Sequence, residues 1–491
     1  MCLRSRRFPS LCLITGVLAA FFMSVPLGFA DAPEVERRLN ERLFSGSTEA
    51  GRSAGSIIDA YLTMSESPVP VGDDFNLTTI WPGMAGWDAV SKWAAANEQM
   101  GVALLASQDK PLLGMPYGRS NVKDEWAEMN VVIDVAPGTG LTGVEYEYLY
   151  GAMETILCWA TAEFYRLLEA EQYEDAFKIA IATNRLLRQG GEQEMIREKL
   201  WFLETLSFAL STQRDAMYAY LDRIPAALYK QLGTKDYPFI NMGDDQRMRR
   251  LAMPEGDRIF VEYLLEEAFD RSGQADEARF AEIFGELQAR ETPLDRFGTK
   301  KRWARLATLH GSLDASKEKL VEVYDDWWRR WRSRQFEPIM DLPTAYSRLN
   351  EVRFAAVQLA VRDLEDVFRA REELITNING TIFSAGLCGY VKTFENWPRD
   401  FSGVYSVYSV KRFDFDPYDS DYGGLTYKKL SRPLTVESPY GQLKVEDCIL
   451  YALGRDHIDD QGSESTNDGA VGDIVIWPPL RQLARDEKLI D

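Results

Sequence analysis

The residues from Leu450 to Pro479 read LYALGRDHIDDQGSESTNDGAVGDIVIWPP, and they decide how the C-terminal part of the chain folds. One apolar run, residues 449–453, ends at Gly454. A second apolar run, residues 474–477, is stopped by Pro478 and Pro479. The connection between the two runs is rich in acidic and glycine residues. Short apolar runs that bracket such a connection predict two strands joined as a β-hairpin.

The loop between these predicted strands carries five aspartates. Crowded carboxylates repel one another unless they are solvated, protonated or bound to a cation. Oxygen-rich loops suit a hard cation such as Ca²⁺, which takes about six to eight oxygen ligands. We therefore expect a calcium site here, and its candidate ligands are the carbonyl of Leu453 and the carboxylates of Asp456, Asp459, Asp460, Asp468 and Asp473. A solvated turn with Asx-type hydrogen bonds is the alternative.

The same segment resembles the C-terminal loop of the major (G-type) pseudopilins of type II secretion. In that family an L-Y-S-L-G-x-D-G segment and a later D-I close around a calcium ion. The residues that carry the resemblance are 451–456, 459–462 and 472–474 in the loop, 416–418 and 423–427 upstream of it, and 387–390 and 396–398 at the expected helix end and turn. Together they span about residues 380 to 479. The resemblance implies a pseudopilin-like β module with a calcium loop.

The chain also departs from that family. No G-F-T-L-x-E prepilin site and no long apolar helix precede Leu387. His457 stands where the family has glycine, and Ser463 to Val471 form an insertion. The resemblance therefore implies a borrowed module with a fold and a metal site, and not a pilus subunit. It implies no activity.

The N-terminus indicates export from the cytoplasm. Arg4, Arg6 and Arg7 precede an apolar stretch from residue 11 to 29, and Gly28 and Ala30 are small residues at the two positions that a signal peptidase reads. This pattern predicts a signal peptide over residues 1–30, a mature protein that begins at Asp31, and a periplasmic or secreted location. No later segment is apolar enough over a sufficient length to span a bilayer.

The chain of 491 residues carries a formal charge of −20, and the loss of residues 1–30, with three arginines and no acid, changes this to −23. Such a charge disfavours nucleic acid and anionic lipid as partners, so we expect a protein partner. Cys158, Cys388 and Cys448 remain in the mature chain. An oxidising compartment would permit a bridge between Cys388 and Cys448, but three buried thiols are the preferred interpretation.

Helical periodicity dominates from Ala32 to Phe394 and strand-like runs dominate from Val404 to Trp477. We predict a mainly α (α+β) fold, with a helical body over residues 31–379 and a small antiparallel β module over 380–491. Tetratricopeptide-like hairpins are expected at 165–176 and 260–278, stacked irregularly. The expected helices include 32–64, 87–105, segments of 145–210, 303–309, 315–334, 343–375 and 382–394, with a break at 377–380.

Few residues point to catalysis. The only histidines are His310 and His457, and the chain contains no G-x-S-x-G, H-E-x-x-H, C-x-x-C or Walker A motif. His310 is expected to cap a helix end, and Trp327 and Trp331 to be buried on one face of a helix. The acidic run at residues 414, 416, 419 and 421 predicts a solvated turn. We identify no catalytic residue from these patterns.

Two classes of function remain open. The first is an exported, non-enzymatic scaffold or interaction protein. The alternative is an extracytoplasmic hydrolase of polysaccharide or peptide. A hydrolase would show a deep pocket with converging carboxylates of shifted pKa, and a scaffold would show a broad groove or an apolar patch.

Overall fold

The computed structural model of the chain describes residues 33–72, 76–135, 144–145, 147–233, 251–291, 298–333, 337–361, 364–408, 410, 415–421, 423–464 and 472–490. The predicted signal peptide, its cleavage site and Asp468 lie outside these ranges. Within them, no helix combines the length and the apolar character needed to cross a membrane.

The protein is mainly helical with a small antiparallel sheet near its C-terminus, as the sequence predicts. The first part of the helical body contains α1 (Pro33–Leu43), α2 (Ala54–Tyr61), α3 (Trp87–Ala96), α4 (Glu98–Ser107), α5 (Asp124–Glu128), α6 (Glu147–Glu169), α7 (Tyr173–Gly190), α8 (Ile196–Ala219) and α9 (Ala226–Leu232). Two strands of two residues each, β1 (Asp134–Val135) and β2 (Val144–Glu145), pair antiparallel beside it.

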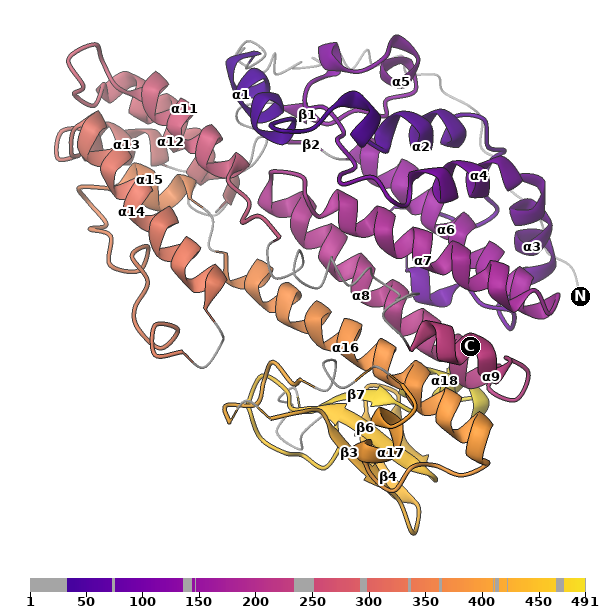
Figure 1. Cartoon of the computed structure of the whole chain (residues 1–491). Helices are drawn as coiled ribbons and strands as arrows, with labels where there is room; N and C mark the ends of the chain where they lie inside the picture. The colour runs from indigo at the N-terminus through magenta and orange to yellow at the C-terminus, as the bar shows by residue number, and fades with distance from the viewer. Residues whose placement is uncertain are drawn as a thin grey trace, which may run out of the picture.

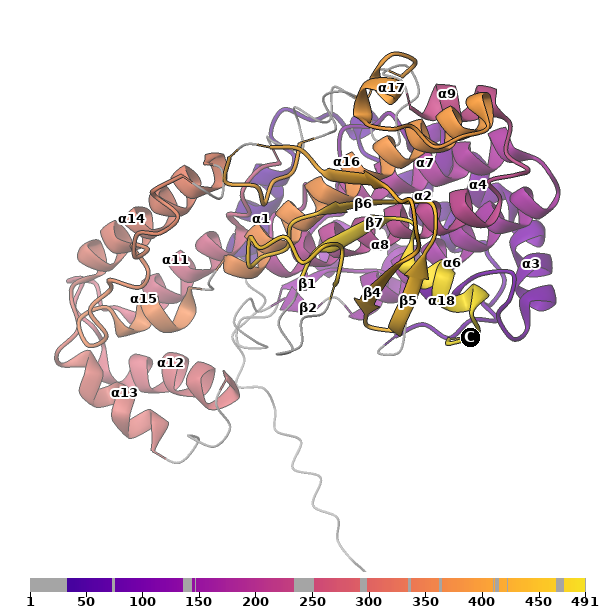
Figure 2. The same ribbon diagram turned by 90° about the horizontal axis from the view of Figure 1, so that it is seen from below.

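A second group of helices forms a lobe at one end of the molecule (Figures 1 and 2). It contains α11 (Gly256–Ala268), α12 (Glu277–Glu291), α13 (Thr299–Ala307), α14 (Leu313–Arg332) and α15 (Ala355–Ala360). The long helix α16 (Glu365–Phe394) then runs from this lobe past α8 to the C-terminal sheet (Figure 1). It connects all three parts of the protein.

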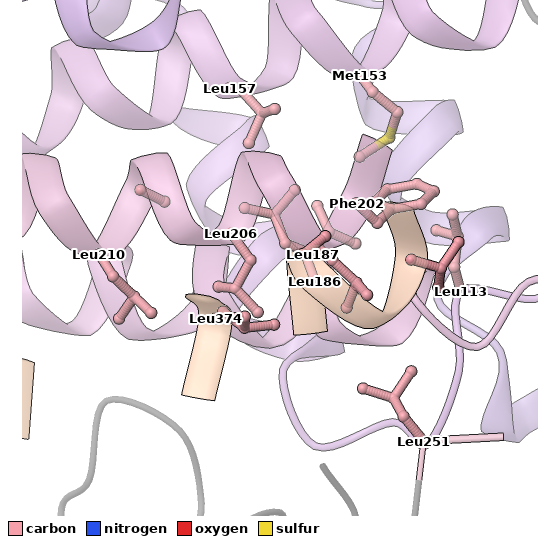
Figure 3. Close-up of a cluster of buried hydrophobic side chains, with 14 of the residues drawn as sticks. Leu113, Met153, Leu157, Leu186, Leu187, Phe202, Leu206, Leu210, Leu251 and Leu374 are labelled. Atoms are coloured by element: carbon pink, nitrogen blue, oxygen red, sulfur yellow. The ribbon is translucent and has the colours of Figure 1, made fainter. Parts of the chain in front are cut away.

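The centre of the helical body is an apolar cluster between α6, α7 and α8 (Figure 3). Leu157 of α6, Leu187 of α7 and Leu206 of α8 are each less than 2% exposed. Leu374 of α16 belongs to the same cluster. The helical hairpin predicted at 165–176 is confirmed, because α6 and α7 are antiparallel neighbours joined at residues 170–172. Burial of these side chains is the main term that stabilises the body, at about 25 cal/mol per Å².

The C-terminal module, which we define as the residues after α16, contains α17 (Phe401–Tyr405), β3 (Thr426–Lys429), β4 (Leu434–Ser438), β5 (Gly441–Val445), β6 (Cys448–Ala452), β7 (Ile474–Trp477) and α18 (Leu480–Asp486). Its main sheet has the order β3-β6-β7 and is antiparallel, and β4 and β5 form a separate hairpin. The predicted hairpin is confirmed, since Leu450 lies opposite Trp477 and Ala452 opposite Ile474.

β6 is the central strand of this sheet, and every one of its residues is buried. Cys448, Leu450 and Ala452 belong to the apolar cluster of the helical body. Ile449 and Tyr451, on the other face, pack with a smaller cluster that includes Val436 and Leu480. A strand that is buried on both faces needs a continuous apolar run, which explains the sequence of residues 448–452.

Three of the predicted helices are wrong in extent. The helix expected over 32–64 ends at Leu43, and Gly46 follows in the left-handed region at φ 74°. The helix expected over 87–105 is divided at Asn97, a buried residue whose amide donates to the Trp93 carbonyl and whose side-chain oxygen accepts from Ser65 N–H. In the range 343–375 the Asn350 side chain accepts from the N–H groups of Val352 and Arg353, which favours a turn over a helix.

The predicted break at residues 377–380 is also wrong, because α16 continues through it. The domain boundary expected between residues 379 and 380 therefore falls inside this helix. Asn377, Asn379 and Gly380 are all buried. Their tertiary contacts outweigh the weak helix propensity of asparagine and glycine.

Candidate functional site

The connection between β6 and β7 holds the acidic residues that the sequence singled out. After β6 the chain passes through residues 453–462 and then pairs with itself. Asp473 N–H donates to the Ser463 carbonyl at 2.8 Å, and Gly472 N–H donates to the Glu464 carbonyl at 3.0 Å. The ends of the predicted insertion are therefore fixed by backbone hydrogen bonds, and residues 465–471 lie outside the described residues.

Asp473 is the most buried of the described loop acids, at 1% exposure. Its Oδ2 accepts from Gly462 N–H at 2.7 Å. Its Oδ1 is also buried and has no hydrogen-bond partner among the described residues. Burial raises the pKa of Asp473 to about 7, and the negative charges of Asp459 and Asp460 add to this shift. At neutral pH this carboxyl needs a proton or a cation.

Asp460 and Asp459 differ in their surroundings. Asp460 Oδ2 lies 3.1 Å from the position that a Cβ on Gly472 would occupy, which places this carboxylate beside the start of β7. Asp459 Oδ1 instead accepts from Tyr451 Oη at 2.7 Å, and its Oδ2 is 3.9 Å from Lys428 Nζ. Partial burial alone would raise the pKa of Asp459, but these partners lower it overall.

The other described candidate ligands, Asp456 and Leu453, take part in hydrogen bonds that involve backbone N–H groups. Asp456 Oδ1 accepts from Ile458 N–H at 3.1 Å in an Asx-type turn. Leu453 N–H donates to Asp416 Oδ2 at 2.8 Å, and Asp416 Oδ1 accepts from Tyr418 N–H at 2.8 Å. Asp416 is fully buried, and burial raises its pKa to about 6. The solvated turn predicted for the acidic run is therefore wrong at Asp416, although Asp421 is exposed.

Asp416 links two segments that carry the family resemblance, because its carboxylate joins residues 416–418 to Leu453. His457 strengthens this link, since its Nδ1 lies 2.8 Å from the Tyr418 carbonyl oxygen. Within the described ranges, no group of three or more His, Cys, Asp or Glu side chains is arranged to hold a metal. Among the predicted ligands, Asp459 and Asp460 both lie close enough to Asp473 for their charges to raise its pKa, and the Asp460 carboxylate lies beside Gly472.

A second polar cluster joins the C-terminal module to the helical body. Asp215 of α8 is buried and accepts from Arg481 Nε at 2.6 Å and from an Arg485 guanidinium nitrogen at 3.3 Å. Burial raises the pKa of Asp215, and the charges of Arg481 and Arg485 act against that shift. The Arg485 guanidinium also lies 4.6 Å from the centre of the Trp81 ring.

A cavity of about 180 Å³ lies beside this cluster, between α8, α16 and β7. Arg214 lines it and donates to Asn377 Oδ1 and Thr381 Oγ1 of α16, each at 2.7 Å. Glu464 lines it from the loop, and its Oε1 accepts from Val475 N–H at 3.2 Å. Burial raises the pKa of Glu464 to about 7 and lowers that of Arg214 to about 10. The sequence patterns did not identify Arg214 or Glu464 as site residues. The charged pair Arg214-Asp215 inside the otherwise apolar pattern of residues 202–217 was a signal that could have indicated Arg214.

Comparison of the chain with protein-family models, with curated proteins and with solved structures finds no match.

The helical body contains a further buried acid, Glu198 of α8. It accepts a hydrogen bond from Tyr117 Oη, and Tyr117 Oη in turn accepts from Glu194 N–H at 2.9 Å. Burial raises the pKa of Glu198 to about 8. Nearby, a cavity of about 590 Å³ is lined by Glu194, and Arg42 holds that carboxylate at 2.7 Å.

Two other sequence predictions are confirmed, for the tryptophans of α14 and for the cysteines, and a third is changed. Trp327 and Trp331 are each 1% exposed, so they are core residues of α14. The capping role expected of His310 is found at another helix than the one beside it in sequence: His310 Nε2 accepts from Ala356 N–H at 3.2 Å at the start of α15, and burial lowers the pKa of His310. The three cysteines of the predicted mature chain are buried free thiols.

Proposed function

We propose that this chain is an exported, non-enzymatic interaction protein, and that its C-terminal module is pseudopilin-like and binds Ca²⁺ in the β6–β7 loop. The observation that carries the proposal is the Asp473 carboxylate, which is buried and has one oxygen without a hydrogen-bond partner in the described part of the chain. Export is supported by the arginine-rich start and the apolar stretch that follows it.

The electrostatics of the loop favour a cation. An ionised carboxylate that is buried without a counter-charge costs several kcal/mol, and Asp460 beside it increases the cost. A divalent cation bound to Asp473 and Asp460 would remove this repulsion. Main-chain carbonyls and water would supply the remaining oxygen ligands. The family resemblance supports calcium as the cation.

An interaction role is supported by the attachment of the module to the helical body. The module is fixed by α16, which runs into it, and by the buried ion pairs of Asp215 with Arg481 and Arg485. A module held in this way presents a stable surface to a partner. The acidic character of the chain favours a basic protein partner over nucleic acid.

Direct calcium binding tests this proposal. Isothermal titration calorimetry of the mature protein with CaCl₂ at pH 8 should give a saturable site in the wild type. The site should be absent in Asp473→Asn, which removes the charge but preserves the shape. Asp325→Asn is a matched control, because Asp325 is exposed on α14. Affinity should fall when the pH is lowered through 7, since protons compete for Asp473. Equal heats in wild type and Asp473→Asn would contradict the assignment.

A hydrolase of polysaccharide or peptide is the second candidate. It is favoured by Glu464, whose raised pKa suits a general acid, and by Glu373, which lines the same cavity. The test is hydrolysis of polysaccharide and peptide substrate panels by the wild type and by Glu464→Gln. Activity that is lost in this variant would support the hydrolase, and no turnover by the wild type would contradict it.

A further inference from the structure

A small cavity with aromatic walls lies where the C-terminal module meets the end of α8. It has a volume of about 270 Å³ and is separate from the acidic loop and from the cavity beside Arg214. Trp477 forms a buried wall. The Tyr218 ring centre is 5.5 Å from that of Trp477, and the Trp397 ring centre is 6.0 Å from it. Tyr218 and Trp397 are half-buried, so their rings remain accessible.

The opening of this cavity is strongly acidic. Glu446 and Asp447 lie on the turn between β5 and β6, and Asp486 and Glu487 lie at the end of α18. All four carboxylates belong to exposed residues. Lys444 also lines the cavity, and Lys429 Nζ lies 3.1 Å from the Trp397 carbonyl oxygen. The negative charges of these carboxylates also affect the aromatic wall. Burial raises the pKa of Tyr218 to about 12, and the charges of Asp486, Asp447 and Glu446 add to this shift.

Aromatic faces and carboxylates attract the same kind of ligand. The face of an indole or phenol ring is negative, and a cation within about 6 Å of the ring centre is stabilised by it. The carboxylates attract the same cation through longer-range electrostatics and would form charge-assisted hydrogen bonds with its N–H groups. An anionic ligand is repelled by the carboxylates, and a neutral ligand lacks the charge attraction that a cation has.

We propose that this aromatic–acidic cavity binds one arginine or lysine side chain of a partner protein. The proposal deepens the interaction role proposed above and rests on it. The volume is below the roughly 300 to 1,000 Å³ of sites for drug-sized ligands, so it suits a single side chain. The positive charges of Lys444 and Lys429 weaken the attraction for an incoming positive group.

The test uses short peptides that differ only in their central residue. Ac-Gly-Gly-Arg-Gly-Gly-NH₂ and its lysine counterpart are titrated into the mature protein by calorimetry at low salt, with the glutamine counterpart as the neutral control. We expect saturable binding of the arginine and lysine peptides and none of the glutamine peptide. Trp397→Ala should weaken binding about tenfold. Lys444→Met should tighten it.

Charge variants separate a local site from the general acidity of the chain. The double variant Glu446→Gln/Asp447→Asn should weaken binding of the arginine peptide about tenfold. The matched control Glu318→Gln/Asp314→Asn removes the same charge from exposed residues of α14, and it should leave binding within twofold of wild type. An equal loss in both double variants would overturn the proposal, because the effect would then be one of net charge.

Two further outcomes would overturn it. One is equal binding of the glutamine and arginine peptides, and the other is binding of a neutral sugar such as maltotriose in place of either basic peptide. The calcium titration on Asp473 is independent of this cavity. Loss of calcium binding with intact peptide binding would remove only the proposed calcium site, and the reverse result would remove only this inference.

Discussion

Gly380 of α16 lies directly against Ile476 of β7. A Cβ added at Gly380 would stand 2.5 Å from Ile476 Cγ2 and within 3 Å of its Cγ1 and Cδ1 atoms. One turn of the same helix carries Asn377 and Thr381, which accept hydrogen bonds from Arg214 of α8. This part of α16 therefore contacts the sheet through a glycine and the helical body through polar side chains.

The first prediction concerns this contact. Gly380→Ala should lower the free energy of unfolding. The added methyl group overpacks the contact at a cost of about 1 to 3 kcal/mol, and the higher helix propensity of alanine offsets only about 1 kcal/mol of this. Chemical denaturation by urea measures the change. Gly151→Ala on α6 is the matched control, since a Cβ there meets no atom within 4 Å, and it should stabilise the protein slightly. In an Ile476→Ala background the loss caused by Gly380→Ala should be smaller than in the wild type, as a double-mutant cycle would measure. Equal effects of the two glycine substitutions would disprove the contact.

The second prediction concerns Asp215. Asp215→Asn leaves Arg481 and Arg485 buried without their counter-charge, so it should destabilise the protein by about 3 to 5 kcal/mol. Urea unfolding followed by circular dichroism measures this. The same substitution at the exposed Asp325 of α14 should change stability by less than about 0.5 kcal/mol. A loss at Asp215 no larger than that at Asp325 would show that these ion pairs do not hold the module.

The third prediction is a pH dependence at Glu198. Its folded pKa of about 8 lies above its unfolded value, so the folded state binds the additional proton. The resulting stability is complete below about pH 4, falls as the pH rises, and is lost above pH 8. In that interval Glu198→Gln should reduce the downward slope by up to about 1.4 kcal/mol per pH unit. Urea unfolding at pH 5, 7 and 9 measures this slope, and parallel curves for wild type and variant would contradict the assigned pKa.

The two-strand hairpin at Leu450–Pro479 and the helical hairpin of α6 and α7 could be predicted because their signals are local. Apolar periodicity, apolar runs and turn residues depend only on residues that are close in sequence. The continuity of α16 could not be predicted in this way. Glycine has low helix propensity. Gly380 is nevertheless explained inside the helix by Ile476, which is distant in sequence but packs against it in the fold and leaves no room for a side chain.

The candidate site shows the same limit. The acidic loop is conspicuous in the sequence, but its aspartates have different partners in the fold. Asp459 is held by Tyr451 and Lys428, Asp456 by its own turn, and Asp473 by burial against Gly462. The packing of β6 and β7 decides which carboxylate of the loop is buried from water. The composition of the loop alone does not predict this.

The measurement that tests the central claim most directly is thermal melting of the mature protein at pH 8, in EDTA and in millimolar CaCl₂. Ca²⁺ should raise the melting temperature of the wild type by about 3 °C. A ligand at about a hundredfold excess over its Kd contributes about 2.7 kcal/mol, and a chain of this length has an unfolding entropy of about 1 kcal/mol per kelvin. Asp456→Asn should retain the increase. Asp473→Asn should melt at the same temperature in both buffers, and in EDTA it should be at least as stable as the wild type because it buries no charge. A wild-type melting temperature that is the same in EDTA and in Ca²⁺ would contradict the calcium site.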